Sequence, residues 1–263
     1  MRICNCSRRL PSVALALACA AFTAPLDAQS ARQPQWVVSA QTGLADTFQM
    51  TLGGTFGPGP AWQNRLTTSL VNILRQGDAF SVYGWDTFDL RDRAHNWQSG
   101  IGYKLPVLKK HGQTLSLATG VQRWLLPSVK SGANDWVLPG NLTYQAGARR
   151  ISALVTADSW TLLKSSLPLG AEIYTQGWLQ YRLIKREHFQ MVFKNGPAHT
   201  YSWNFYGTNG NRVIRYQTAL VMAFGNTSIE GGFRKQWGLQ KGIRDNNFWQ
   251  FGLTRTFSGP LPR

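Results

Sequence analysis

The sequence has 263 residues, of which 28 are Lys or Arg and 12 are Asp or Glu. Charged residues make up 15% of the chain, against about 25% in ordinary soluble domains, which excludes a disordered polyelectrolyte and a long coiled coil. The three cysteines are Cys4, Cys6 and Cys19, so the rest of the chain cannot form a disulfide scaffold.

The beginning of the chain has the layout of a secretory signal peptide. A basic start and a short apolar run over residues 12–26 precede the small residue Ala28, which stands at a suitable cleavage point. The run is shorter than the about 20 residues that a membrane-spanning helix needs. We therefore predict a signal peptide at 1–28 and a periplasmic segment at 29–35. The alternatives are a lipoprotein signal at Cys19 and a terminal helix of a cytosolic protein.

After this start, apolar and polar residues alternate with a period of two, which is typical of β-strands. No later stretch of 18 apolar residues exists, so we expect no membrane-spanning helix. The alternation is clearest over residues 97–105, 172–183, 214–224 and 248–257.

The two faces of these expected strands differ in an unusual way. One face is large and apolar, as in Ile214, Tyr216 and Phe224, and the other carries Gln, Thr, Ser, Gly and a few charges. A membrane barrel shows this pattern because its apolar face contacts lipid and its polar face lines the lumen. We predict an all-β protein, a transmembrane antiparallel up-and-down β-barrel at 36–257 followed by a tail at 258–263. A secreted soluble β-sandwich or barrel is the alternative.

Short and long connections alternate along the chain, as in bacterial barrels with short periplasmic turns and long outer loops. The pattern predicts twelve strands, provided that residues 36–56 form one strand and that 188–202 form another with a bulge at 195–197. If either segment splits, the number becomes fourteen. Short turns are expected at 75–78, 109–112, 147–150, 184–187 and 225–227, and long connections at 57–62, 88–96, 126–140, 163–170, 203–212 and 240–247.

The segment from Phe248 to Phe257 resembles the last strand of Gram-negative outer-membrane β-barrels, which alternates hydrophobic residues and ends in an aromatic one. The resemblance implies an outer-membrane location, contact with outer-membrane lipid, and recognition of the strand ending at Phe257 by the barrel-assembly machinery. In size and strand number the chain is also similar to small twelve-stranded channels for acidic oligosaccharides.

The alternation also predicts which charges point into the lumen, and basic residues outnumber acidic ones there. A basic pore favours anions, so we expect a porin-like channel for small anionic solutes. The alternative is a structural or assembly barrel whose lumen these side chains fill. The expected basic lining is Arg65, Lys104, Arg182, Lys194, Arg215 and Arg234, and the expected acidic partners are Asp158, Glu172 and Glu230.

Two other basic residues, Lys235 and Arg255, fall on the lipid-facing side of their strands. The connection 126–140 contains Trp136 and is the candidate for a loop that constricts the lumen.

No set of residues predicts catalysis. His199 and Ser202 lie three positions apart on one expected strand and so face opposite sides, while His95 falls in an expected connection. We expect no catalytic residues, no metal site, no cofactor and no nucleic-acid partner. An outer-membrane enzyme that acts on lipid remains a second alternative, and the sequence leaves the oligomeric state open.

Overall fold

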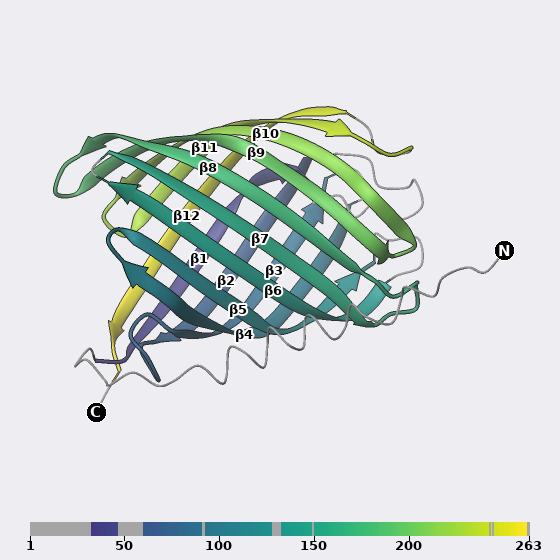
Figure 1. Ribbon diagram of the computed structural model, residues 1–263, viewed down its shortest axis with the longest axis horizontal. Helices are drawn as coiled ribbons and strands as arrows, with labels where there is room; N and C mark the ends of the chain where they lie inside the picture. The colour runs from purple at the N-terminus through teal and green to yellow at the C-terminus, as the bar shows by residue number, and fades with distance from the viewer. Residues whose placement is uncertain are drawn as a thin grey trace.

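The computed structural model describes residues 33–46, 60–90, 93–127, 133–148, 150–241, 243 and 245–261. They form a closed antiparallel barrel of twelve strands in which each strand pairs with its neighbours in the chain (Figure 1). None of the described residues belongs to a helix that is long and apolar enough to cross a membrane. The strands are β1 (Gln35–Asp46), β2 (Pro60–Val71), β3 (Ala79–Asp89), β4 (Ala94–Lys110), β5 (Gln113–Leu126), β6 (Ala133–Ala148), β7 (Ile151–Lys164), β8 (Ala171–Lys185), β9 (Phe189–Phe205), β10 (Thr208–Phe224), β11 (Thr227–Gly238) and β12 (Asn246–Pro260).

The barrel closes where the first strand pairs with the last. Gln35 of β1 pairs with Pro260 of β12, and the ladder runs on to Leu44 and Phe251. Both ends of the barrel sequence therefore lie at one rim, which we call the terminal rim; the other is the distal rim. Because pairing reaches Pro260, the prediction that the barrel ends at Phe257 is wrong by three residues.

The strand number of twelve is confirmed, and fourteen is wrong because the ring of hydrogen-bonded strands is closed. Residues 188–202 do lie in one strand, β9, as expected. For the other segment, 36–56, the structure describes the strand only as far as Asp46, and residues 47–59 lie outside the described part, as do residues 1–32 with the predicted signal peptide.

The predicted bulge at 195–197 is wrong. Asn195, Gly196 and Pro197 pair with consecutive residues of β10. On its other side β9 pairs with β8, and the register is the same at Ala198 and at Asn195. Gly196 and Pro197, between them, have no paired residue in β8. Proline lacks the N–H group that the ladder would use, which accounts for a gap without a register shift. The register shifts in the pairings of this strand lie at Arg182/Ile184, Thr208/Gly210 and Asn211/Val213.

Several expected long connections are much shorter than predicted. Only Tyr206 and Gly207 join β9 to β10, where we expected a connection over 203–212. Both residues have positive φ angles, 52° and 80°, which let the chain reverse within two residues. Polar and turn-forming residues such as Asn209 and Gly210 suggested a loop, but they continue the ladder of β10.

The outer face carries a belt of exposed apolar side chains, as the alternation predicted. Ile214, Tyr216 and Phe224 of β10 are outward and exposed, as are Trp249, Phe251, Leu253 and Phe257 of β12. Such a belt is typical of a barrel whose outside contacts lipid.

Candidate functional site: the barrel lumen

The predicted basic residues fall into two groups inside the barrel. Arg65 and Lys104 line a large internal cavity, and Arg182 lines a smaller one near the terminal rim. The other three, Lys194, Arg215 and Arg234, belong to a polar network on the wall formed by β8–β12. The larger cavity thus lies on the β2–β8 side of the lumen, and the hydrogen-bonded side chains gather on the β8–β12 side.

The network on the filled side is a continuous chain of hydrogen bonds between neighbouring strands. Gln217 donates to the hydroxyl of Tyr174 over 3.1 Å and accepts from Nε of Arg234 over 3.2 Å. Arg234 also donates to Gln250 over 2.8 Å, and Gln250 donates in turn to Glu230 over 3.3 Å. These hydrogen bonds are buried or partly buried, and such a satisfied network favours a single arrangement of the side chains.

Two of the predicted acidic residues neutralise cations of this wall. Glu230 accepts a hydrogen bond from Nζ of Lys194 at 2.8 Å, and the Lys194 ammonium lies 4.6 Å from the ring centre of Trp178. Glu172 pairs with Arg212 and also accepts from the hydroxyl of Ser202 at 2.7 Å. The Glu172 and Arg212 side chains are 1% and 2% exposed, so this ion pair is buried.

Arg212 is the main lumen residue that sequence reasoning missed. We placed it in a connection, but it lies in β10 as the extra residue between the paired positions Asn211 and Val213. A bulge inserts one residue and so redirects a side chain. Here both Arg212 and Val213 are buried, which brings the guanidinium to Glu172. Simple alternation could not have found it.

Arg65 stands where two cavities meet. A cavity of about 530 Å³ extends from β2 to β8, and a cavity of about 310 Å³ lies against β1, β11 and β12. Both are lined by Arg65 and Trp85. The guanidinium carbon of Arg65 is 5.8 Å from the ring centres of both Tyr83 and Trp85, and no described carboxylate forms an ion pair with it. Arg65 is thus a cation exposed to the lumen space.

The third acidic residue, Asp158, lies across the larger cavity from Arg65. Its carboxylate accepts a hydrogen bond from the side-chain amide of Asn141 at 2.6 Å. The cavity therefore contains both signs of charge, with Arg65 and Lys104 facing Asp158.

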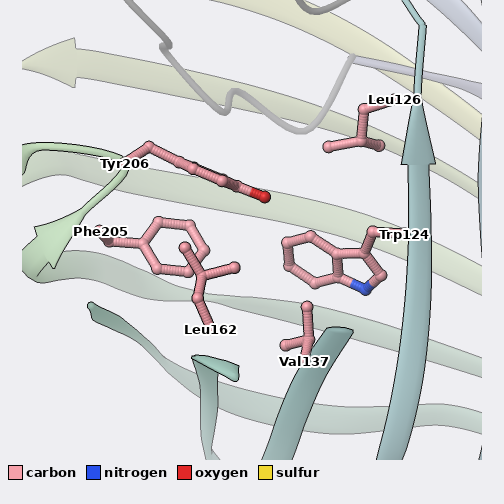
Figure 2. Packing of buried hydrophobic residues seen from close by; sticks show 6 residues of the cluster. All are labelled: Trp124, Leu126, Val137, Leu162, Phe205 and Tyr206. Carbon is pink, nitrogen blue, oxygen red and sulfur yellow. The ribbon is translucent and has the colours of Figure 1, made fainter. Parts of the chain in front are cut away.

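An apolar cluster closes the distal end of the larger cavity. Figure 2 shows its six buried side chains, with Phe205 and Tyr206 of the β9–β10 hairpin facing Trp124. Trp124 and Trp160 both line the cavity and pack in or against this cluster, so the cluster forms one end of the cavity. The cluster consists of Trp124, Leu126, Val137, Leu162, Phe205 and Tyr206.

The expected connection 126–140, the candidate for a constricting loop, is shorter than predicted because residues from Ala133 onward belong to β6, and its residues 128–132 lie outside the described part of the chain. Trp136 lies in β6 and points outward with 40% exposure, 5.0 Å from the guanidinium carbon of Arg123. The next residue back, Asp135, does point inward and is fully buried. Among the described residues, the two-residue turn after β9 contributes Tyr206 to the cluster that closes the larger cavity, and we call this turn the Tyr206 plug.

The residues considered for catalysis face opposite sides of the wall. Ser202 bonds to Glu172 inside the barrel, whereas Nε2 of His199 bonds to Asn211 at 2.9 Å on the outer side. In the described part of the chain, no group of three His, Cys, Asp or Glu residues is placed to hold a metal ion.

Comparison with protein-family models gives no match, and comparison with characterised proteins gives none at the sequence level. Among solved structures, the chain is similar to LpxR from Salmonella typhimurium, with a TM-score of 0.52 and 10% identity over 83% of this chain and 99% of that one. It is also similar to the NanC porin, with a TM-score of 0.50 and 9% identity over 86% of this chain and all of that one (100%). The chain therefore has the fold of outer-membrane β-barrels.

Proposed function

We propose that the chain is an outer-membrane channel whose lumen favours small anionic solutes. The observation that carries the proposal is the position of Arg65, a cation without an ion-pair partner in the described chain, at the junction of two internal cavities. A cation lining a narrow aqueous path attracts anions and repels cations. One of the two similar structures is a porin, and a porin is the class of protein that we propose here.

The charge balance of the lumen supports the same function. Glu172 forms an ion pair with Arg212, and Glu230 forms one with Lys194. Because the charges of each pair cancel, they contribute little to the electrostatic potential of the lumen. Arg65 and Lys104 then face the single carboxylate of Asp158 across the larger cavity. The space that a solute can enter is therefore net positive. A planar guanidinium also suits carboxylate or phosphate groups, which it can bind through two parallel hydrogen bonds.

The second candidate, a filled structural barrel, is favoured by one observation. The Tyr206 plug belongs to the apolar cluster at the end of the larger cavity, and the network around Arg234 fills part of the lumen along β8–β12. The two functions differ in ion conduction, which can be measured directly.

The test is the reversal potential of the refolded mature protein in a planar lipid bilayer under a KCl gradient. We expect steady conductance with preference for chloride, and a clear loss of that preference in Arg65→Gln. The matched control is Lys235→Gln, which removes an outward-facing cation beside Trp237. Unchanged selectivity in Arg65→Gln would overturn the role of Arg65. A folded barrel that stays silent, both as wild type and as Tyr206→Ala, would overturn the channel itself in favour of the filled barrel.

A further inference from the structure

A row of polar residues lies on the outside of the barrel, where apolar side chains are the rule. Thr42, Asn64 and Asp86 are paired neighbours on β1, β2 and β3. Their strand positions are out of phase with Arg65 and Trp85, which line the lumen, so their side chains point outward. Polar and charged side chains at lipid-facing positions are unfavourable and are typically functional.

Asp86 is held by a histidine on the next strand. Nδ1 of His95 lies 3.0 and 3.1 Å from the two carboxylate oxygens of Asp86. The His95 ring packs against Phe88 at 4.6 Å and Trp97 at 6.0 Å between ring centres. Asp86 is therefore held in place by a hydrogen bond to His95, a residue that we had placed in a connection. Nε2 of His95 has no hydrogen-bond partner within the described chain, and the side chain is 53% exposed.

Asn64 presents an oriented donor beside this pair. Its Oδ1 atom accepts hydrogen bonds from Thr42 Oγ1 at 2.7 Å and from Trp62 Nε1 at 3.2 Å. These two contacts fix the amide plane and identify the oxygen, which leaves the NH₂ group turned away from both donors. Among the residues described, nothing accepts a hydrogen bond from that group.

The row borders a groove of about 640 Å³ on the outer wall, which we call the outer groove. Ala40 and Gly84 keep its floor low, and no atom lies within 4 Å of the position that a Cβ of Gly84 would take. Exposed apolar side chains, Leu66, Trp97 and Leu253, form its walls. The groove thus combines apolar walls with hydrogen-bonding groups.

Arg255 lines the same groove and gives it a positive charge. The residue pairs in regular register with both Ala40 and Thr227, so its outward position is a property of β12 and not of a bulge. An arginine on the lipid face of a barrel is unfavourable by about 2–4 kcal/mol at the membrane midplane and by about 0–1 kcal/mol near the interfaces. A bound anion would offset this cost.

We propose that the outer groove binds one anionic membrane lipid, with its phosphate near the donors of Asn64 and Arg255 and its acyl chains along Leu66, Leu253 and Trp97. The net charge of the groove indicates that the bound lipid is anionic. Arg65 and Arg255 both line the groove, whereas Asp86 is the one carboxylate of its described lining and is 8% exposed and hydrogen-bonded to His95, so the lining carries more positive than negative charge. The amide donor of Asn64 also requires an acceptor. Arg65 also lines this groove, so the lipid test uses Asn64 and Arg255, which the proposed channel function does not involve.

The experiment measures lipid retention by native mass spectrometry. The refolded, delipidated barrel in neutral detergent is titrated with phosphatidylglycerol or with phosphatidylcholine of the same acyl chains. We expect retention of phosphatidylglycerol to exceed that of phosphatidylcholine by about tenfold, which corresponds to about 1.4 kcal/mol. Asn64→Leu and Arg255→Leu should remove this difference, and Lys235→Leu, an outward cation away from the groove, should keep it.

Each remaining outcome is decisive. Equal retention of the two lipids by the wild type overturns the proposal, as does an unchanged preference in both groove variants. Full competition by inorganic phosphate would show a free-anion site and would also overturn it. If Arg255→Leu does not fold, Asn64→Asp serves instead, because a carboxylate there should repel the lipid phosphate. Bilayer conductance should be the same in all groove variants, so a failure here is distinct from a failure of the channel.

Discussion

The phenolic hydroxyl of Tyr206, in the turn between β9 and β10, donates a hydrogen bond to a carboxylate oxygen of Asp135 near the start of β6. The two residues are 71 positions apart in the chain, and both are buried. Asp135 pairs with Trp124 of the apolar cluster in the β5–β6 ladder. The bond therefore ties the β9–β10 turn across the distal end of the lumen and holds the Tyr206 plug in place.

The Tyr206 plug should limit ion flow. Replacing Tyr206 with Ala removes the bond to Asp135 and the ring that faces Trp124, so we expect the single-channel conductance in a planar bilayer to increase at least about twofold, the pore cross-section being wider at its narrowest point. Trp136→Ala is the control, since that ring lies at the same end but points outward. Equal conductance of the wild type and Tyr206→Ala would show that the current takes a route that avoids the plug.

The same bond should make barrel stability depend on pH in the alkaline range. Burial, followed by the bond to Asp135, raises the pKa of Tyr206 above its ordinary value of 10.0. The folded barrel thus holds this proton more tightly than the unfolded chain does. Its contribution to stability is complete below pH 10.0 and is lost as the pH rises through the higher folded pKa.

This pH dependence can be isolated with Tyr206→Phe, which lacks the titrating group. We expect the midpoint of denaturant unfolding, followed by tryptophan fluorescence, to fall more steeply above pH 10.0 in the wild type than in Tyr206→Phe. Identical slopes in the two proteins would contradict the assignment. At neutral pH the variant should be less stable by about 1–3 kcal/mol, because Asp135 then loses its buried donor.

The two lumen ion pairs should differ in their effect on stability. Arg212→Met leaves the carboxylate of Glu172, 1% exposed, without its cation, and we expect the free energy of unfolding to drop by about 3–5 kcal/mol. The pair of Lys194 and Glu230 is 17% and 31% exposed, so Lys194→Met should cost about 1 kcal/mol or less.

The double variant Arg212→Met/Glu172→Gln provides the control for this comparison. Removing both charges eliminates the unpaired buried carboxylate, so urea unfolding in detergent should show at least half of the lost stability restored. If the double variant is as unstable as Arg212→Met alone, the loss comes from packing at the bulge and not from the charge.

Two paired glycines at the seam between β1 and β12 should respond differently to a methyl group. A Cβ on Gly43 would lie 2.2 Å from the carbonyl oxygen of Phe251, whereas a Cβ on Gly252 would have no atom within 4 Å. Gly43→Ala must therefore push the two strands apart, and we expect a loss of about 1–3 kcal/mol and a lower yield of folded barrel.

Gly252→Ala is the matched control and should fold as the wild type does. The shift of the folded band on an unheated electrophoresis gel measures the yield for both. Equal yields would mean that the seam can relax around the added methyl group.

Alternation along the sequence was sufficient to predict the faces of the strands. Ile214 and Arg215 are neighbours in the chain, and because successive side chains of a strand point to opposite faces, one is exposed outside and the other is buried inside. Turn-forming residues between the alternating segments gave the number of strands, because each hairpin needs its own reversal.

The parts that could not be predicted depend on contacts between distant segments. Arg212 enters the lumen through a bulge, which shifts the alternation at one position and leaves no mark in the residue pattern. The Tyr206 plug needs Asp135, a partner on another strand that no local pattern specifies. His95 and Asp86 lie on the outer face of the barrel, where the alternation predicts apolar residues. Their hydrogen bond follows only from the register of β3 and β4.

The pairing of β1 with β12 also sets the order of events in assembly. Val37, among the first residues of the barrel, has Ser258, among the last, as its partner, so this ladder cannot begin to form until the twelfth strand has been made. Until then both strands present open edges, which invite pairing with other chains. The barrel therefore has to be protected as an incomplete sheet, and its final step is a single long-range closure that is intrinsically slow.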